Sequence, residues 1–119
     1  MKNQKERKYD LEDRTLKYTK EVRNFAKEFK NSPLAYDDIR QLIRASGSVG
    51  ANYIEANDGL SKKDFLMRIK ICKKEIKECR YWLQLLESPS EEAEEIRQKL
   101  ENEATELIYI FAAVLRNSQ

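Results

Sequence analysis

The chain has 119 residues, of which 37% are charged and 40% hydrophobic, and its formal net charge is only +2. With 3 Gly and 2 Pro it lacks the frequent turns of a β-sandwich, and its regularly recurring apolar residues argue against disorder. The longest uncharged stretch, 45–54, has about half of the ~20 residues needed to span a bilayer, and no apolar signal region precedes it. We therefore expect one cytoplasmic domain of long amphipathic helices, with no membrane partner.

The residue types that carry most enzyme chemistry are missing. There is no histidine, the commonest general base and metal ligand. Cys72 and Cys79 lie two helical turns apart, about 10 Å, which is beyond disulfide reach, and we expect both in the core. No zinc-ligand spacing, Gly-rich phosphate loop or G-x-S-x-G motif occurs. We expect no catalytic residue, metal, cofactor or small-molecule substrate, and hence no enzyme.

The first predicted helix covers about 11–31 and follows a flexible basic arm at 1–9. Apolar side chains recur on one face of this helix at spacings of 4, 3 and 4, and Pro33 ends it because the residue before proline avoids the α conformation. The face consists of Tyr18, Val22, Phe25 and Phe29. The basic groups of the arm are Lys2, Lys5, Arg7 and Lys8.

The second predicted helix, about 34–57, carries two apolar or small stripes and ends at Asp58-Gly59. A helix of a monomeric bundle needs only one stripe, so the other predicts a contact with another subunit. Two mid-helix glycines, Gly47 and Gly50, each cost about 1 kcal/mol relative to Ala. They predict that a neighbouring helix, of this chain or of another subunit, approaches closely. The stripes are Ile43, Gly47, Gly50 and Ile54, and Leu42, Ser46, Val49 and Tyr53.

The same helix carries a narrow polar stripe of Arg44, Ser48, Asn52 and Glu55. It is either a binding or subunit-contact surface or an ordinary exposed face. Glu55 near the helix C-terminus opposes the macrodipole, and two costly glycines lie beside the stripe. Because both the macrodipole preference and the helix propensity are violated in one place, we favour the functional interpretation.

The third and fourth predicted helices cover about 61–87 and 91–116. Ser61 and Asp64 form a capping-box pattern before the third helix, and Ser90 can cap the fourth. Short connections make consecutive helices antiparallel neighbours. The sequence therefore predicts an all-α, antiparallel up-down-up-down four-helix bundle over 10–117. The heptad seam of the third helix is Phe65, Ile69, Cys72, Ile76, Cys79, Leu83 and Leu86.

Basic residues gather on the third helix, within about 120° of arc at ~100° per residue and opposite its apolar seam. We call this set the basic ridge: Lys63, Lys70, Lys73, Lys74, Lys77 and Arg80. Such a ridge can neutralise the phosphates of a nucleic acid. Alternatively, it is a solvated face paired with acids of the fourth helix such as Glu91, Glu94 and Glu95. Trp82, beside the seam, is either an interface anchor or a core residue. Base stacking on aromatic residues is disfavoured because most of them sit at core positions.

Three segments resemble a bacterial family of four-helix bundles that are encoded within intervening sequences of large-subunit ribosomal RNA genes. They are RASGSVGANYIEA at 44–56, SKKDF at 61–65 and KKEIKE at 73–78. The accessory variability protein of diversity-generating retroelements is a relative of that family. The Asn52-x-x-Glu55 pair and the SKKDF helix start look like the family's signature, although many members have Pro at the position of Gly50 and Gly at that of Ala56.

The resemblance implies a ring-like homopentamer without known catalytic activity. In the accessory-protein branch it also implies association with a reverse transcriptase and with RNA through positive surfaces. We thus carry two functional hypotheses. The first is a homo-oligomer that binds RNA or a nucleoprotein through the basic ridge and the N-terminal arm. The second is a protein-binding scaffold or structural assembly without nucleic-acid affinity, in which the ridge meets acidic faces of neighbours.

Overall fold

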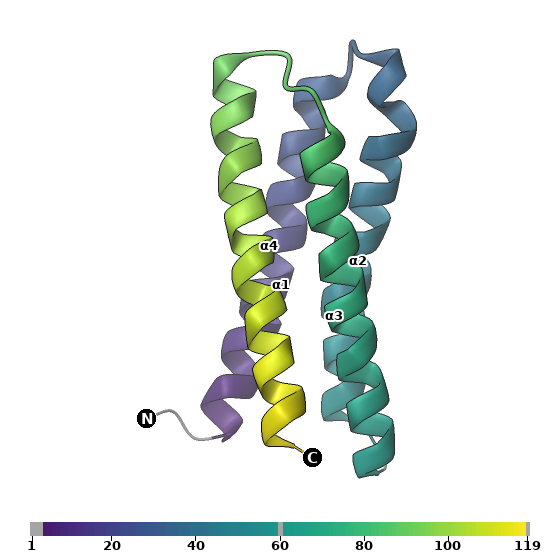
Figure 1. The fold of residues 1–119 in the computed structure, drawn as a ribbon, viewed down its shortest axis with the longest axis vertical. Helices are drawn as coiled ribbons and strands as arrows, with labels where there is room; N and C mark the ends of the chain where they lie inside the picture. The colour runs from purple at the N-terminus through teal and green to yellow at the C-terminus, as the bar shows by residue number, and fades with distance from the viewer. Residues whose placement is uncertain (1–3, 60, 119) are drawn as a thin grey trace.

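A computed structural model describes residues 4–59 and 61–118 of the chain, with side chains from residue 11 onward. Four long helices run antiparallel to their neighbours and form a bundle of 45 × 27 × 19 Å (Figure 1). The helices are α1 (Gln4–Ala26), α2 (Tyr36–Asn57), α3 (Lys62–Leu85) and α4 (Glu91–Asn117), with short 3₁₀ turns at Lys27–Phe29 and Pro33–Ala35. The predicted all-α antiparallel four-helix bundle is confirmed.

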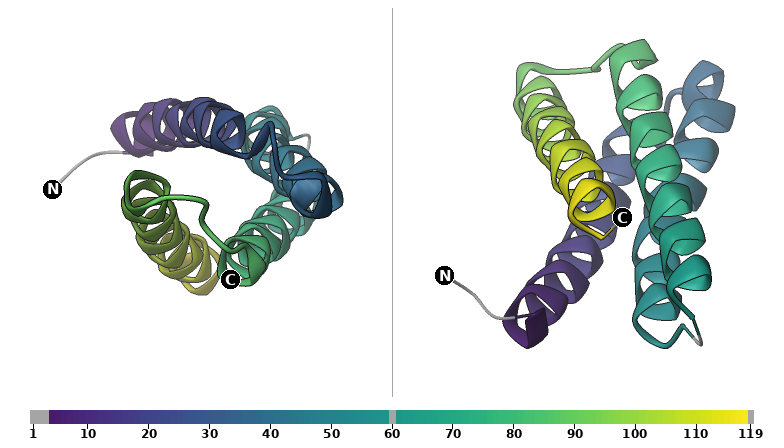
Figure 2. Two further views of the ribbon diagram at one scale, coloured as in Figure 1. Left: turned by 90° about the horizontal axis from the view of Figure 1, so that it is seen from above. Right: turned by 60° about the horizontal axis from the view of Figure 1, so that its bottom comes forward.

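The helices do not contact one another equally. α2 packs along α3, α3 along α4 and α1 along α2, whereas α1 and α4 touch over a shorter length. Figure 2 shows the N-terminal half of α1 diverging from α4. Where the two helices meet, Arg14 donates to both carboxylate oxygens of Glu103, at 2.7 and 2.8 Å. The Tyr18 hydroxyl donates to the Leu100 carbonyl at 3.0 Å. The bundle is thus tightest along α2 and α3.

The core lies where the apolar periodicity predicted it. All four residues of the predicted α1 face are buried, and so is the α3 seam from Ile69 to Leu86, while Phe65 at its start is partly buried. Cys72 and Cys79 have no exposed surface and are free thiols, as core residues should be. In α2 the stripe of Leu42, Ser46, Val49 and Tyr53 is the buried one.

The helix boundaries follow local chemistry closely at α3 and α4. The Ser61 hydroxyl accepts from the Asp64 amide and the Ser90 hydroxyl from the Ala93 amide, each at 3.0 Å, which confirms both predicted N-caps. α1 differs from the expectation. It begins at Gln4 rather than near residue 11, because no Gly or Pro interrupts the sequence before Pro33. Residues 4–9, predicted as part of a flexible arm, thus extend this helix. Residues 1–3, which include Lys2 of the predicted arm, lie outside the described residues.

Gly59, just after the end of α2, lies in a crowded position. The helix stops at Asn57, and Gly59 follows without the positive φ of a left-handed cap. A Cβ on Gly59 would lie 2.9 Å from Asp64 Oδ2 and 3.0 Å from the Ala56 carbonyl oxygen. Close approach of the chain, rather than backbone conformation, explains glycine here.

Over residues 4–59 and 61–118, none of the helices is long and apolar enough to cross a membrane.

Candidate nucleic-acid interface

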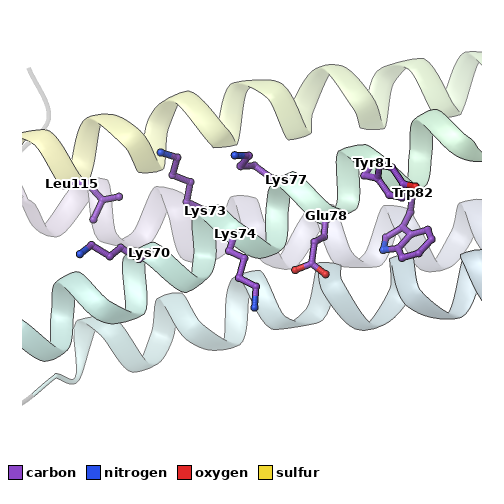
Figure 3. A pocket seen from close by; sticks show the side chains of 8 residues that line it. All are labelled: Lys70, Lys73, Lys74, Lys77, Glu78, Tyr81, Trp82 and Leu115. Atoms are coloured by element: carbon purple, nitrogen blue, oxygen red, sulfur yellow. The ribbon is translucent and has the colours of Figure 1, made fainter.

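The basic ridge lies on α3, and Figure 3 shows its Lys74 extending toward α2. Lys63, Lys70, Lys74 and Lys77 are exposed, whereas Lys73 and Arg80 are partly buried. In Figure 3, Lys73 and Lys77 extend to the side of α4. Arg80 donates to the Thr105 hydroxyl of α4 at 3.4 Å. Of the six residues predicted from the sequence, Lys70, Lys73, Lys74 and Lys77 line one hollow, whereas Lys63 and Arg80 do not.

Among the residues that the structure describes, no ridge side chain lies within 4.0 Å of a carboxylate oxygen. The acids that the alternative interpretation invoked are elsewhere. Glu94 is bound by Arg97 at 2.7 Å, and hydrogen bonds from Arg97 and Ser88 lower the pKa of Glu94 to about 2. Since α3 and α4 are antiparallel, the start of α4 lies beside the end of α3, away from most of the lysines. The predicted pairing is thus absent from the described part of the chain.

The half of α4 that lies beside the lysines carries no acid of its own. Its last carboxylate is Glu106, and residues 107–118 contain no Asp or Glu but do contain Arg116. Leu115, in this half, lines the same hollow as Lys70. The positive charge of the ridge is therefore not neutralised by the neighbouring helix, and it is available to an external anion.

An open hollow of about 830 Å³ runs along the ridge (Figure 3). Tyr81 and Trp82 lie at one end, with ring centroids 5.2 Å apart in an edge-to-face arrangement. Tyr81 is 57% exposed, whereas the indole nitrogen of Trp82 is buried and has no hydrogen-bond partner among the described residues. The hollow is lined by Lys70, Lys73, Lys74, Lys77, Glu78, Tyr81, Trp82 and Leu115.

Sequence reasoning did not assign the two aromatic residues to the ridge. A signal was present, because Lys70, Lys74, Lys77 and Tyr81 follow at spacings of 4, 3 and 4, which places Tyr81 on the lysine stripe. Leu115 could not be found this way, since only the packing of α4 on α3 brings it to the hollow.

The polar stripe of α2 faces α3 of the same chain. Arg44 donates to Glu75 at 3.2 Å and to Glu78 at 3.4 Å. Asn52 accepts from Arg68 at 3.0 Å and donates to the carbonyl and hydroxyl oxygens of Ser48 at 2.9 and 3.0 Å. Two of the four stripe residues, Arg44 and Asn52, therefore bond to α3, and Ser48 bonds to Asn52 within α2. The fourth, Glu55, is exposed.

The two mid-helix glycines have different surroundings. A Cβ on Gly50 would lie 3.2 Å from Thr15 Oγ1, so α1 approaches closely there. A Cβ on Gly47 would meet nothing within 4 Å. No described part of this chain thus explains Gly47, and the intrachain form of the expectation fails at that position.

Residues 7–113 match the family model described as 23S rRNA-intervening sequence protein. The match covers all four helices and most of the chain. The chain belongs to this family. The predicted resemblance is thereby confirmed at the level of the family.

A solved structure from the S23 ribosomal protein family of Bacteroides thetaiotaomicron is similar to this family member over most of both chains. The identity is 28%, the TM-score is 0.77, and the alignment covers 88% of this chain and 97% of the other. That crystal structure is described as a protein of unknown function. A search among curated proteins found no match. The comparisons thus agree on family and fold.

Proposed function

We propose that this member of the 23S rRNA-intervening sequence protein family is a non-enzymatic, self-associating bundle that binds nucleic acid, RNA in particular, or a nucleoprotein. The observation that carries the proposal is the set of six cationic side chains on α3 without carboxylate partners among the described residues. Their role is to neutralise phosphates, which positions a nucleic acid without reading its sequence.

Self-association is supported by an apolar strip on the outside of α1 and α2. Leu16 is 54% exposed and Ile54 is 51% exposed, although both are large aliphatic residues. Ile54 lies two helical turns after Gly47 on the same face of α2, and a Cβ on Gly47 would meet nothing within 4 Å. A second copy would bury these side chains, and the ring-like homopentamer implied by the family resemblance would place five basic ridges on one particle. Several ridges on one particle strengthen binding through effective concentration.

The test is a comparison of two charge-reversed variants with the same net charge. Lys73→Glu/Lys77→Glu inverts the middle of the ridge, whereas Lys20→Glu/Lys30→Glu changes exposed positions outside it, on α1 and in the loop that follows. We expect the ridge variant to lose at least about tenfold in affinity for a labelled RNA and the control to lose little. Equal losses would mean that overall charge alone drives binding, and the ridge would have no special role.

The second candidate, a protein-binding scaffold without nucleic-acid affinity, is favoured by the same apolar strip. In that case the ridge contacts acidic faces of neighbouring proteins. Light scattering separates the two proposals: on the scaffold proposal, Lys73→Glu/Lys77→Glu lowers the particle mass, and the wild type binds no RNA at low salt. On the proposal that we favour, the mass is unchanged and RNA binding is lost.

A further inference from the structure

We infer that the hollow on α3 accepts single-stranded nucleic acid, with phosphates along the lysines and one unpaired base against the exposed ring of Tyr81. The inference rests on the proposed function and adds the form of the ligand and the residue that contacts a base. It is carried by the continuation of the lysine stripe into an exposed aromatic residue at the end of one hollow (Figure 3).

The geometry of the stripe fits a strand that follows the helix axis. Lys70, Lys74, Lys77 and Tyr81 lie on one face and span about 16 Å at the helical rise of 1.5 Å per residue. All four are exposed, so a ligand reaches them without rearrangement of the bundle. A strand lying along this face meets three cationic groups and then an aromatic ring.

The two ends of the hollow differ in charge. Beside the aromatic pair lies the carboxylate of Glu78, which Arg44 binds from α2. A carboxylate disfavours phosphate at this end, whereas no carboxylate lines the hollow beside Lys70. The arrangement therefore separates a phosphate-binding end from an end suited to an uncharged, flat group, which is what a nucleobase presents.

The exposed ring is the reason to expect an unpaired strand. In a duplex the faces of the bases are stacked on one another, so a side chain outside the helix cannot reach them. In a single strand each base offers a π-face, and stacking on aromatic side chains is a common means of binding such strands. An acidic protein segment would satisfy the lysines, but carboxylates alone offer no flat group to Tyr81.

Three probes of equal length separate this inference from the proposed function. They are an unstructured RNA strand of ten nucleotides, the same strand annealed to its complement, and an abasic strand that keeps sugar and phosphate. Binding is followed by anisotropy of a label and by the emission of Trp82, which is the only tryptophan in the chain and lines the hollow. We expect the RNA strand to bind about tenfold more tightly than the abasic strand, the effect of roughly one stacked base. We also expect binding of the RNA strand to change the emission of Trp82.

Tyr81→Ala should lose about tenfold in affinity for the RNA strand and leave binding of the abasic strand unchanged, whereas Tyr81→Phe should keep both. The matched control is Tyr109→Ala, since Tyr109 is 70% exposed on α4 and does not line the hollow. Circular dichroism checks that each variant is folded.

Other outcomes have distinct meanings. If the abasic strand or the duplex binds as tightly as the RNA strand, the inference fails and the proposed function stands. If polyglutamate of equal charge binds as tightly, the hollow is a site for acidic proteins, and the inference fails as well. If no probe binds at low salt, the proposed function fails together with the inference.

Discussion

The guanidinium of Arg44 on α2 lies 3.2 Å from a carboxylate oxygen of Glu75 on α3, and the Glu75 side chain is only 9% exposed. Arg44 itself is half exposed and reaches Glu78 as well. About two turns further along α2, the side-chain oxygen of Asn52 accepts a hydrogen bond from Arg68 of α3. The seam between α2 and α3 thus combines an apolar interior with charged and polar contacts at its edge.

Removing Arg44 should destabilise the fold because it leaves the buried Glu75 carboxylate without its charged partner. We expect Arg44→Met to lower the free energy of unfolding in urea by about 1–3 kcal/mol, and by the lower part of that range because water reaches the half-exposed guanidinium site. The control is Arg40→Met, which removes the exposed ion pair of Arg40 with Asp37 at 3.7 Å. It should change the free energy of unfolding by less than about 0.5 kcal/mol. Equal effects of the two variants would show that the Arg44–Glu75 pair has no particular role.

The two glycines of α2 should respond oppositely to alanine. Gly47→Ala should raise the stability of the single bundle by up to about 1 kcal/mol, because the site is open within the described chain and alanine favours the helix. Gly50→Ala should gain little or lose stability, since Thr15 is buried and its hydroxyl is held by the Leu11 carbonyl at 2.7 Å, so it yields poorly to a new methyl group. Thermal melts of both variants test this pair of expectations. A larger gain at Gly50 than at Gly47 would contradict it.

A larger side chain at Gly47 tests the proposed subunit contact. If a second copy covers this site, Gly47→Leu should overpack the contact and lower the particle mass measured by light scattering, at a cost of about 1–3 kcal/mol. Leu34→Gln is a suitable comparison because Leu34 is 99% exposed in the loop between α1 and α2. An unchanged mass and melting temperature for Gly47→Leu would mean that this part of α2 faces solvent.

The start of α4 should lose stability in acid. Hydrogen bonds from Arg97 and Ser88 hold the pKa of Glu94 at about 2, below its ordinary value of 4.5. Because the folded state favours the charged carboxylate, this contribution is present above pH 4.5 and is lost as the pH falls toward 2. Glu94→Gln should therefore make stability less dependent on pH in this range, whereas Glu95→Gln should not. Urea midpoints measured from pH 5 to 2 decide the matter, and identical pH profiles for wild type and Glu94→Gln would contradict the account.

The two cysteines should be unreactive in the folded protein. Burial raises the pKa of Cys72 from 9 to about 12, and burial together with Glu75 raises the pKa of Cys79 as well. A disulfide reagent at pH 8 should modify both thiols only at the rate of unfolding. The sign for stability is the opposite of that for Glu94: the stabilising effect is complete below pH 9 and declines as the pH rises toward 12. Rapid labelling of either thiol under native conditions would show that the α3 seam opens locally.

The fold was predictable because the apolar periodicity and the capping residues indicate the same helices. The seam from Phe65 to Leu86 repeats without interruption, and Ser61 and Ser90 cap helices where the pattern begins. The start of α1 was harder to predict, since the basic residues of 1–9 suggested an arm but nothing in them interrupts a helix. Helix ends without Gly or Pro leave little local information.

The site was only partly predictable, because periodicity gives the face of a residue but not its neighbours. The ridge followed from spacing alone. The partners of Arg44 did not, since Glu75 lies beside the seam and becomes buried only when α2 covers it. The polar stripe therefore looked like an external binding surface, whereas Arg44 and Asn52 bond to α3 and Ser48 bonds to Asn52 within α2. By contrast, the antiparallel order predicted for the third and fourth helices already places the acids at 91–95 away from most of the lysines.

The salt dependence of RNA binding tests the central claim most directly. Single-stranded RNA held by six phosphate contacts should give a plot of log affinity against log salt with a slope of about −4. The variant Lys70→Gln/Lys74→Gln/Lys77→Gln should reduce the magnitude of this slope by about 2 while the bundle stays folded. A flat dependence for the wild type, or the same slope for the wild type and the triple variant, would show that the α3 ridge does not bind phosphates.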